Sequence, residues 1–512
     1  METAVRATPF ANESPVDGAP LSAVEATSPD DVKSLVARAR AAQVAWAERT
    51  VEERIRILAP VKDRVLDRAE AIAREVHRET GKPEVEALLG EVLPTADGVD
   101  YWSRSIEELL AATEIELDGM SYPKKSGWTF KEPRGTIGLI TPWNYPVALP
   151  LRTLIPALLA GNAVVWKPSE VTPRSGRAVW DLFLGLLPEG VLEMAQGGGD
   201  VGEALSKSDL DLVVFVGGVE SGRKVAHACA ERLSPCALEL GGKDAAIVLK
   251  DANLARAANG VVWGALTNAG QNCAAIERVY VVKEVAEAFI EKVTAEVKAL
   301  RIGDEIGPLT TEKQRALVLG QVAAAESAGA KLLVGARSSE RKLPPIVVRV
   351  ESDDTPLMKD ETFGPILPIA VVADVEEAIT RANASRYGLT ASLWTKNTAS
   401  AERIAHRLRV GVVTINNHAF TGALAAAPWS GHGDSGYGVT SSPVALEALT
   451  RPRFVLTDKS RARREMWWYP YTPALRQIAL SMAILRSSTS GIFRKVGAFF
   501  RLLGGFIGRF KT

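Results

Sequence analysis

The stretch Gly135-Thr-Ile-Gly-Leu-Ile-Thr141-Pro-Trp-Asn144-Tyr-Pro146 joins a short apolar run to a turn bounded by two prolines. A helix-like segment over residues 149–160 follows, and a second apolar run begins at Ala163. Short buried runs that alternate with helices are typical of a parallel sheet with helices on both faces. The stretch therefore predicts a βαβ unit with a polar turn at the carboxyl end of its first strand.

The same alternation continues along the chain. Strands are expected at residues 135–141, 163–167, 191–195 and 212–216, with helices at 149–160, 174–187 and 201–206. A second series of strands is expected near 246–249, 278–282, 366–372, 391–394 and 411–416. Because 512 residues are too many for one hydrophobic core, we predict two α/β domains that meet near residues 239–242.

The first quarter of the chain is mainly helical in pattern. Residues 1–22 lack periodicity and are rich in Pro, Ala, Ser and Asp, so a loose or draping arm is expected. Ser28-Pro-Asp-Asp31 then predicts the start of a helix over 32–40. Further helices are expected over 52–79 and 83–113, and strands near 114–118 and 127–131.

The composition argues against some classes of protein. The chain has 61 basic and 61 acidic residues, and this balance disfavours a general nucleic-acid-binding protein. Three cysteines do not make a disulfide framework, and the first residues lack the apolar segment of a secretion signal, so a cytoplasmic protein is expected. The five histidines lack the spacing of zinc ligands, and no metal site is predicted.

Three polar residues are candidates for chemistry. Cys273 lies in Asn268-Ala-Gly-Gln-Asn-Cys273-Ala-Ala, where small neighbours let a reactant approach the sulfur, although a lone cysteine is more often structural. Glu239 lies in Ala237-Leu-Glu-Leu-Gly-Gly-Lys243, where apolar neighbours suit a general base and Lys243 suits an ion-pair partner instead. Asn144 follows a strand, where its amide can donate to an oxyanion or simply stabilise a turn.

Together these motifs resemble the aldehyde dehydrogenase superfamily. Leu-Glu239-Leu-Gly-Gly-Lys and Gly270-Gln-Asn-Cys273 are similar to its two signatures. Further similar segments, in order, are Pro142-Trp-Asn-Tyr-Pro146, Trp166-Lys-Pro-Ser-Glu170, Glu361-Thr-Phe-Gly-Pro365, Gly388-Leu-Thr-Ala-Ser-Leu393, Gly411-Val-Val-Thr-Ile-Asn-Asn417 and Ser435-Gly-Tyr-Gly438. The resemblance covers roughly residues 30–455.

The resemblance implies a fold and a mechanism. The fold would be α/β, with a Rossmann-like cofactor domain, a second α/β catalytic domain and a small β oligomerisation element. Cys273 would attack the aldehyde carbon as a thiolate, and Asn144 with the Cys273 backbone N–H would form the oxyanion hole. Glu239 would then activate the water that hydrolyses the thioester. An NAD(P)-dependent aldehyde dehydrogenase of the hydrolytic type is expected.

The resemblance also implies a site for NAD, with NADP as the alternative. Lys167 and Glu170 are similar to residues that hold the adenosine ribose, and Glu361 and Phe363 to residues at the nicotinamide ribose and ring. The other residues implied at the cofactor are Thr141, Pro142, Trp143, Ser169, Gly217, Gly218, Gly222, Leu240 and Gly241. The glycine segment would bring the start of a helix to the pyrophosphate.

Two positions depart from the family pattern. Gly218 stands where relatives usually have serine or threonine, so backbone N–H groups would have to bind the phosphate there. Thr153 stands where many relatives have lysine, and Val439-Thr440 replace the glutamate that pairs with that lysine. Relatives that act on fatty and aromatic aldehydes share such a threonine, and water is expected to relay the proton instead.

The C-terminal segment is basic and amphipathic. After Glu465 the chain has seven Lys or Arg and no acidic residue. On a helical wheel from Ile492, Val496, Phe499, Phe500, Leu503, Phe506, Ile507 and Phe510 share one face, opposite Arg494, Arg501 and Arg509. Such a helix suits a membrane surface, whereas no apolar run is long enough to predict a spanning helix. Packing on the body or on a partner subunit is the alternative.

These assignments give a predicted domain organisation. Residues 1–22 form the arm, 23–114 and 134–240 the NAD(P)-binding domain, 241–444 the catalytic domain, 115–133 and 445–458 the oligomerisation element, and 459–512 the tail. An exposed strand edge in the oligomerisation element would pair with a second subunit, so a homodimer or homotetramer is expected.

The substrate class has more than one reading. The tail and Thr153 favour medium-chain, long-chain or aromatic aldehydes, and a semialdehyde such as succinate semialdehyde is the alternative. Glu239 argues against an enzyme that transfers the acyl group to coenzyme A. A catalytically silent membrane-binding scaffold on the same fold is disfavoured because Cys273, Glu239 and Asn144 are all present. If the tail binds lipid, the protein would lie at the inner face of a membrane.

Overall fold

Two mainly parallel sheets organise the computed structural model, which describes residues 12–119, 121–338, 340–418 and 420–510. The first sheet has the order β18-β7-β6-β3-β4-β5, and only β18 runs antiparallel to its neighbour. Its strands are β3 (Thr136–Ile140), β4 (Ala163–Lys167), β5 (Leu192–Met194), β6 (Leu212–Val216), β7 (Cys236–Glu239) and β18 (Gly436–Tyr437). β3, β4 and β6 are buried along their whole length, as expected for strands between two helical layers.

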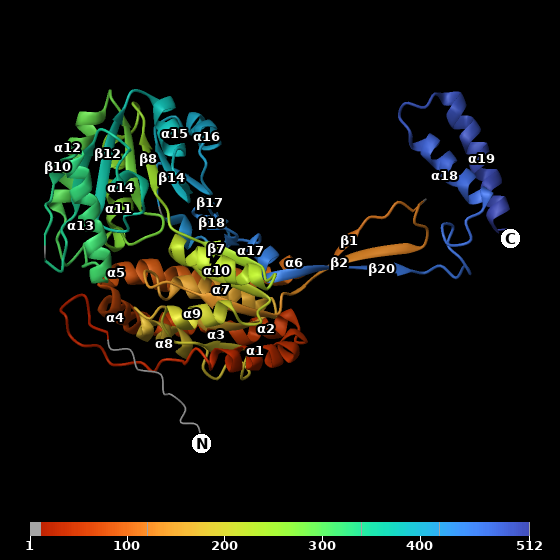
Figure 1. Cartoon of the computed structure of the whole chain (residues 1–512), viewed down its shortest axis with the longest axis horizontal. Helices are drawn as coiled ribbons and strands as arrows, with labels where there is room; N and C mark the ends of the chain where they lie inside the picture. Colours follow the sequence, from red (N-terminus) through yellow and green to blue (C-terminus); the bar gives the residue numbers. More distant parts are fainter. Residues whose placement is uncertain (1–11, 120, 339, 419, 511–512) are drawn as a thin grey trace, which may run out of the picture. The chain divides into compact units, whose positions relative to one another are not determined.

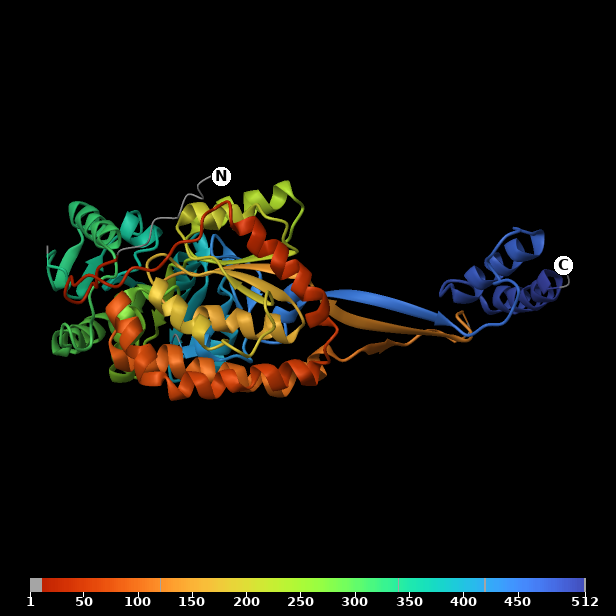
Figure 2. The ribbon, with the colours of Figure 1, turned by 90° about the horizontal axis from the view of Figure 1, so that it is seen from below.

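Helices cover both faces of this sheet (Figures 1 and 2). One face packs on α1 (Val32–Ala47), α9 (Gly199–Ser206) and α10 (Val219–Glu231). The other face packs on α2 (Val51–Leu58), α3 (Pro60–Asp67), α4 (Ala69–Thr80), α6 (Leu93–Leu110), α7 (Ala148–Leu159) and α8 (Pro173–Asp181). Because β3, β6 and β7 are parallel, the residues that follow them meet at one edge of the sheet.

The second sheet has the order β10-β11-β12-β9-β8-β14-β15, with β10 antiparallel to β11 and the rest parallel. Its strands are β8 (Asp244–Val248), β9 (Ile276–Val282), β10 (Lys331–Val334), β11 (Ile346–Val350), β12 (Ile366–Val372), β14 (Thr390–Trp394) and β15 (Val412–Ile415). Helices α11 (Leu254–Leu266) and α12 (Ala286–Ala299) pack on one face. Helices α13 (Glu312–Ser327), α14 (Pro356–Lys359), α15 (Val375–Asn383) and α16 (Thr398–Ala405) pack on the other.

Short elements complete this part of the fold. They are α5 (Glu84–Ala87), a π-helical turn (Leu88–Val92), 3-10 turns at Thr267–Gly270 and Phe420–Ala423, and α17 (Ala445–Leu449). Strand β13 (Tyr387–Gly388) pairs with β17 (His432–Gly433), and β16 (Trp429–Ser430) pairs with β19 (Val439–Thr440).

The chain divides into two structural units. The first comprises residues 1–111 and 130–453, and the second comprises residues 112–129 and 454–512. The second unit contains β1 (Thr113–Ile115), which pairs with β2 (Lys125–Pro133), and the helices α18 (Pro473–Arg486) and α19 (Ile492–Phe510). Strand β20 (Thr450–Asp458) completes the sheet β1-β2-β20. The oligomerising role of this sheet and the finer domain boundaries stay predictions.

The predicted α/β fold class is confirmed, and three predicted elements need correction. The helix predicted over 52–79 is three helices. Pro60, which has no backbone N–H to donate, starts the second of them, and the third begins after Arg68. The helix predicted over 83–113 is interrupted by the π-helical turn. The helix predicted over 174–187 ends at Asp181.

The predicted arm is described only from residue 12 onward, and residues 1–11 lie outside the described part. The amide of Asn12 donates to the backbone carbonyls of Glu170 and Val171 at 2.9 and 3.2 Å. The described part of the arm therefore lies against the loop that follows β4.

Candidate active site

Cys273 lies on a loop with a left-handed backbone. The loop follows α11 and has φ values of 53° at Asn268 and Ala269 and 72° at Gly270. Positive φ is uncommon for residues with a Cβ atom and has to be held by surrounding contacts. At Gly270 a Cβ atom would collide with the carbonyl of Gly364, so only glycine fits this close approach.

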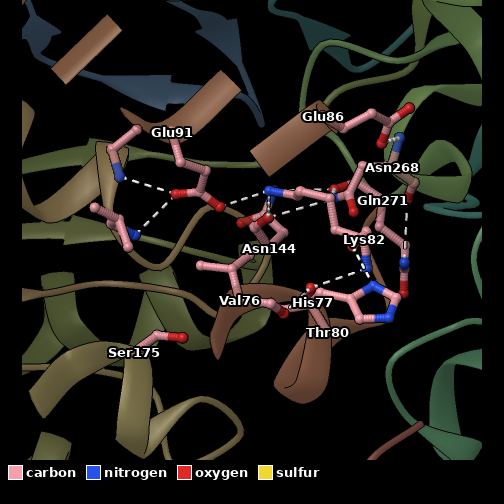
Figure 3. A network of polar contacts seen from close by, with 12 residues as sticks. Val76, His77, Thr80, Lys82, Glu86, Glu91, Asn144, Ser175, Asn268 and Gln271 are labelled. Atoms are coloured by element: carbon pink, nitrogen blue, oxygen red, sulfur yellow. Dashed lines mark hydrogen bonds and ion pairs between the residues drawn. The ribbon is translucent and has the colours of Figure 1, made fainter. Parts of the chain in front are cut away.

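The surrounding contacts that hold the loop come from two directions. Glu86 of α5 accepts hydrogen bonds from the Asn268 backbone N–H at 2.8 Å and from the Thr267 hydroxyl at 3.2 Å. The Asn268 amide donates to the carbonyls of Gln271 and Asn144 at 3.0 and 3.2 Å (Figure 3). The strained residues thus have fixed partners on both sides.

Glu239 reaches the same place from the end of β7. Its Oε1 lies 3.9 Å from the sulfur of Cys273, and its Oε2 accepts a hydrogen bond from the Thr440 hydroxyl at 2.9 Å. The guanidinium of Arg152, on α7, lies 4.0 Å from the same oxygen. A carboxylate within reach of a thiol can take its proton.

Asn144 approaches the loop from the turn after β3. Its side-chain amide donates to the carbonyl of Gln271 at 3.2 Å, two residues before Cys273. The amide nitrogen carries a second hydrogen that can be donated to an oxyanion. Residues from the ends of β3 and β7 and from the loop before β9 therefore converge, as the sequence predicted for Asn144, Glu239 and Cys273.

Electrostatics keep the thiol protonated at rest. Burial raises the pKa of Cys273 well above its ordinary value, and repulsion from the Glu239 carboxylate raises it further. The Arg152 guanidinium acts in the opposite direction. A thiol reacts as a nucleophile through its thiolate, so a neutral Cys273 would need a base, and Glu239 is the carboxylate in contact with it.

Lys243 is not the partner of Glu239, so the ion-pair alternative for these two residues is wrong. Its ammonium contacts Glu277 at 2.6 Å and the Thr362 hydroxyl at 2.8 Å. Glu277 in turn accepts the backbone N–H of Phe363 at 2.7 Å. Phe363 has a φ of 51°, and this buried pair holds its backbone in that conformation.

The residues expected at the nicotinamide end lie together beside this pair. The rings of Trp143 and Phe363 meet edge to face, with centroids 5.6 Å apart. Glu361 accepts the backbone N–H of Gly242 at 3.1 Å. Burial and the nearby Glu277 raise the pKa of Glu361 to about 8, which favours the protonated carboxyl.

The residues expected at the adenosine end follow β4. The ammonium of Lys167 bonds Glu170 at 3.1 Å, and the Ser169 hydroxyl accepts the Val171 backbone N–H at 3.2 Å. Thr141, at the end of β3, accepts a hydrogen bond from the Trp166 ring at 2.9 Å.

The start of α10 fits the pyrophosphate of a dinucleotide. No side chain caps this helix, whose first turn begins after Gly218, and a Cβ atom at Gly218 would meet only open space. Uncapped backbone N–H groups beside open space suit an anion. Gly217 bonds the carbonyl of Glu239 at 3.0 Å, and Gly222 allows α10 to pack closely on Leu240.

A cavity of about 270 Å³ leads to the sulfur of Cys273. Its walls are mostly apolar and come largely from α6, α7 and the ends of β16 and α11. They include Leu89, Pro94, Val99, Trp102, Tyr145, Leu149, Leu151, Trp263 and Trp429. The charged residues around the cavity are Lys82, Glu86 and Arg152, and neither Glu239 nor Asn144 lines it.

Sequence reasoning missed some residues of the site. Arg152 is the one charged residue in the apolar helix α7, and such an isolated charge was a usable signal. Thr440 was noted only as a departure from the family pattern, yet its hydroxyl contacts Glu239. Thr153 and Thr440 line a separate space of about 20 Å³, which has room for one water, and relay of a proton by water stays a prediction.

Comparison with known proteins shows what kind of site this is. The pattern described as "Aldehyde dehydrogenase family" matches residues 3–455. The chain belongs to the aldehyde dehydrogenase family. A 4,4'-diapolycopene aldehyde oxidase of Methylomonas sp is 34% identical over 470 residues, with 91% of this chain and 89% of that protein covered.

Other similar aldehyde dehydrogenases differ in name and in bound cofactor. A protein of Mycobacterium ulcerans (strain Agy99), provisionally named succinate-semialdehyde dehydrogenase [NADP(+)] 2, is 34% identical over 456 residues, covering 86% of this chain and 87% of its own. PnpE solved with nicotinamide adenine dinucleotide is 32% identical, with a TM-score of 0.85 over 89% of this chain and 96% of its own. An NADP-dependent glyceraldehyde-3-phosphate dehydrogenase of Bacillus halodurans C-125, complexed with NADP, is 33% identical, with a TM-score of 0.84 over 88% and 96%.

These comparisons confirm the predicted family, the enzyme class and a nicotinamide dinucleotide as cofactor. They leave the substrate open, because relatives at the same identity carry different substrate names. Among the described residues there is no group of three or more His, Cys, Asp or Glu that could hold a metal ion.

Alkylation of Cys273 by iodoacetamide should report the charges around the thiol. We expect Glu239→Gln to move the pH profile of alkylation to lower pH, because it removes the repulsion that raises the pKa of Cys273. Arg152→Met should move it to higher pH. The rate is measured by mass spectrometry on the peptide that contains Cys273.

Arg301→Met removes a cation on the surface and serves as the control, with an unchanged profile. Shifts of the same sign for Glu239→Gln and Arg152→Met would contradict this account of the site.

Proposed function

We propose that the protein oxidises an apolar long-chain or aromatic aldehyde to the carboxylic acid through a thioester on Cys273. The contact of Glu239 with the Cys273 sulfur at 3.9 Å carries the proposal, because it joins a nucleophile to a base. Glu239 takes the thiol proton, and the thiolate attacks the aldehyde carbon. The oxyanion that forms accepts hydrogen bonds from the Asn144 amide and the Cys273 backbone N–H.

Glu239 serves the reaction a second time after the acyl group is attached. Bound NAD(P) supplies the acceptor for the hydride that the aldehyde carbon loses. Cys273 then holds the acyl group as a thioester. Glu239 releases the first proton to solvent and then removes a proton from the water that cleaves the thioester. The Thr440 hydroxyl, which donates to Glu239 at 2.9 Å, keeps the carboxylate turned toward the sulfur.

The residues proposed to hold the cofactor are those expected from the resemblance. Trp143, Glu361 and Phe363 would contact the nicotinamide end, with Thr141, Pro142, Leu240 and Gly241 beside them. Lys167, Ser169 and Glu170 would hold the adenosine ribose, and the segment with Gly217, Gly218 and Gly222 would receive the pyrophosphate. The Glu170 carboxylate expected at the ribose supports NAD over NADP, because a carboxylate accepts hydrogen bonds from ribose hydroxyls and repels a phosphate.

The first experiment measures NAD(P)H formation with a panel of aldehydes. We expect turnover to increase from short polar aldehydes to long-chain and aromatic ones, because the cavity wall is mainly apolar. Cys273→Ala should abolish turnover of every aldehyde while leaving the melting temperature unchanged. Turnover that survives this substitution would exclude the thioester mechanism.

Gly98 tests the length of the cavity. It lies on α6 at the cavity wall, and a Cβ atom there would meet nothing within 4 Å. We expect Gly98→Leu to fill the cavity without a clash in the protein and to lower kcat/KM for long-chain aldehydes by about tenfold or more. Short aldehydes should keep their kcat/KM.

Gly320 provides a matched control on α13. It is also a helical glycine with open space around it, but it does not line the cavity. Gly320→Leu should leave kcat/KM unchanged for all aldehydes. Equal losses for short and long aldehydes in Gly98→Leu would argue against a long substrate.

A semialdehyde is the second candidate substrate, and Arg152 favours it. This guanidinium lines a mainly apolar cavity and could bind the carboxylate end of a semialdehyde. It is already engaged with the Gly422 carbonyl at 2.5 Å and lies 5.8 Å from the centroid of the Trp429 ring. Because these contacts and Glu239 partly satisfy the cation, the apolar substrate remains our first choice.

We also propose that helices α18 and α19 dock on anionic lipid. The two helices pack on each other, with Ile478, Ser481, Ala498 and Gly505 buried and Ile478 lying against Gly505. The large apolar residues of α19 stay exposed, namely Ile492, Phe493, Val496, Phe499, Phe500, Leu503 and Ile507. The exposed cations Arg494 and Arg501 lie on the same helix. This pairing of apolar and basic surface suits an anionic membrane interface.

Aromatic residues in the segment before α18 add to this surface. Trp467, Trp468, Tyr469 and Tyr471 are exposed, and Trp and Tyr are favoured where apolar lipid meets water. Among the described residues, no helix has the length and apolar character needed to cross a membrane. The proposed contact is therefore at the surface of the bilayer.

Sedimentation with liposomes tests the lipid contact. We expect the full chain to sediment with vesicles that contain phosphatidylserine and to remain in solution with phosphatidylcholine alone. Phe493→Glu should weaken binding by about tenfold or more, because it loses one buried aromatic side chain and adds a negative charge. The side chain of Phe493 is 91% exposed, so the variant should fold normally.

Leu233→Glu is the matched control, because Leu233 is 92% exposed and lies in the first structural unit. It should sediment like the unmodified chain. If Phe493→Glu instead changed the oligomeric state and left sedimentation unaltered, the exposed face would belong to a second copy of the chain and the lipid proposal would fail.

A further inference from the structure

A fully buried ion pair lies next to the Asn144 turn and has no part in the chemistry described above. Lys82 Nζ contacts Glu91 Oε1 at 2.6 Å, and both side chains are inaccessible to solvent. Removal of two charges from water costs several kcal/mol, so a buried pair is weak evidence for stability. The other contacts of the pair therefore explain its presence better than stability does.

Both members of the pair hold the backbone around Asn144 (Figure 3). Lys82 Nζ donates to the Asn144 carbonyl at 2.8 Å. Glu91 Oε2 accepts the backbone N–H groups of Val147 and Ala148 at 2.9 and 3.0 Å. No side chain from the α7 cap position satisfies that helix end, so Glu91 supplies the acceptor from another element. The turn is thus fixed on both sides of Asn144.

The Asn144 carbonyl also contacts the loop that carries Cys273. It accepts hydrogen bonds from Lys82 Nζ at 2.8 Å and from the Asn268 amide at 3.2 Å. The Asn144 amide donates in the other direction, to the Gln271 carbonyl at 3.2 Å. A change in the position of Lys82 therefore moves the oxyanion donor relative to the loop that carries Cys273.

Local backbone features deliver the two side chains. Helix α4 ends at Gly81 in the left-handed conformation, with a φ of 79°, and Lys82 follows directly. Glu91 lies in the π-helical turn Leu88–Val92, where the extra residue per turn changes the direction of the side chains. Such turns are frequent at functional sites.

We propose that Lys82, with Glu91, is a positioning residue that sets the place of the Asn144 amide for the oxyanion. Lys82 lies beside the cavity, but its ammonium is inaccessible to solvent and is already bonded to Glu91 and to the Asn144 carbonyl, so it acts through Asn144. The inference rests on the oxyanion role of Asn144 proposed above. A displacement of about 1 Å at an oxyanion donor is sufficient for a loss of about a hundredfold in rate.

Lys82→Met tests the proposal by removing the ammonium while keeping most of the side-chain volume. We expect kcat/KM for the aldehyde to fall about a hundredfold, with the KM for NAD and the rate of Cys273 alkylation unchanged. Alkylation needs the thiolate but forms no oxyanion, so it separates the donor from the nucleophile. Equal losses of turnover and alkylation would mean that the pair only supports the fold.

A second variant separates the loss of Lys82 from the destabilising effect of leaving the buried Glu91 carboxylate without a cation. Lys82→Met alone leaves Glu91 buried without its cation, whereas the double variant Lys82→Met/Glu91→Gln leaves no charge. We expect the double variant to regain the melting temperature of the unmodified enzyme and to keep the hundredfold loss of kcat/KM. Recovery of activity together with stability would overturn the proposal.

Glu79 provides a matched control for Glu91. It is a buried carboxylate that accepts two backbone N–H groups at the start of α8, from Arg174 and Ser175, and it has no contact with the Asn144 turn. We expect Glu79→Gln to leave kcat/KM and alkylation within about twofold, because it disturbs a helix start of the same kind elsewhere.

A double-mutant cycle with Asn144→Ala separates this inference from the proposed mechanism. If Lys82 acts through Asn144, Lys82→Met should lower kcat/KM by less than twofold further in the Asn144→Ala background. A full hundredfold loss in that background would overturn the role of Lys82 alone. Unchanged activity of Asn144→Ala by itself would instead overturn the oxyanion role of Asn144 and, with it, the proposed mechanism.

Discussion

Burial raises the pKa of the Cys273 thiol, so ionisation of this thiol depends on a nearby base, and the Glu239 carboxylate lies closest to that role. A thiol in water loses its proton readily enough to react, but a buried thiol beside a negative charge does not. The same carboxylate that makes ionisation harder is the group that can accept the proton, at 3.9 Å. The reactivity of the Cys273 thiol is therefore coupled to contact between Glu239, at the end of a strand of the first sheet, and the loop that precedes β9 of the second sheet.

The connection between the two sheets makes that contact. Strand β7 ends at Glu239 and β8 begins at Asp244, so only residues 240–243 separate the base from the second sheet. A Cβ atom at Gly241 would collide with the Glu361 carboxylate, and one at Gly242 would collide with the Cys273 carbonyl. Two glycines are needed because the backbone passes directly between the Glu361 carboxylate and the Cys273 carbonyl.

Much of the fold and the centre of the site could be predicted from the sequence. The apolar runs at 163–167 and 212–216 coincide with β4 and β6, because strands buried on both faces have a strong and local signal. The convergence of Asn144, Glu239 and Cys273 followed from motifs that each end a strand or precede one. β10 was missed because it lies at the edge of its sheet and is only partly buried. β11 was missed although Ile346–Val350 is a mostly buried apolar run inside the sheet.

The partners of these residues could not be predicted in the same way. Glu239 is four residues from Lys243 in the sequence and was the obvious candidate for an ion pair. The fold instead brings Lys243 to Glu277, which is far away in the sequence. Lys82 and Glu91 were not singled out in the sequence, and only the structure brings them together, with Glu91 in the π-helical turn. Long-range polar contacts depend on exact distances between elements, and sequence periodicity does not carry that information.

The cavity in the first unit and helix α19 in the second unit both present apolar surface. A long apolar aldehyde partitions into lipid, so its concentration in water is low and an enzyme at the bilayer surface meets more of it. Oxidation would weaken binding in the cavity, because the carboxylate product carries a charge that an apolar wall does not solvate. The negative charge of Glu239 adds repulsion, whereas Arg152, 4.0 Å from that carboxylate, attracts the product. For the proposed apolar aldehyde, the apolar wall would favour entry of the aldehyde and exit of the acid, and Arg152 would set how strongly the acid is retained.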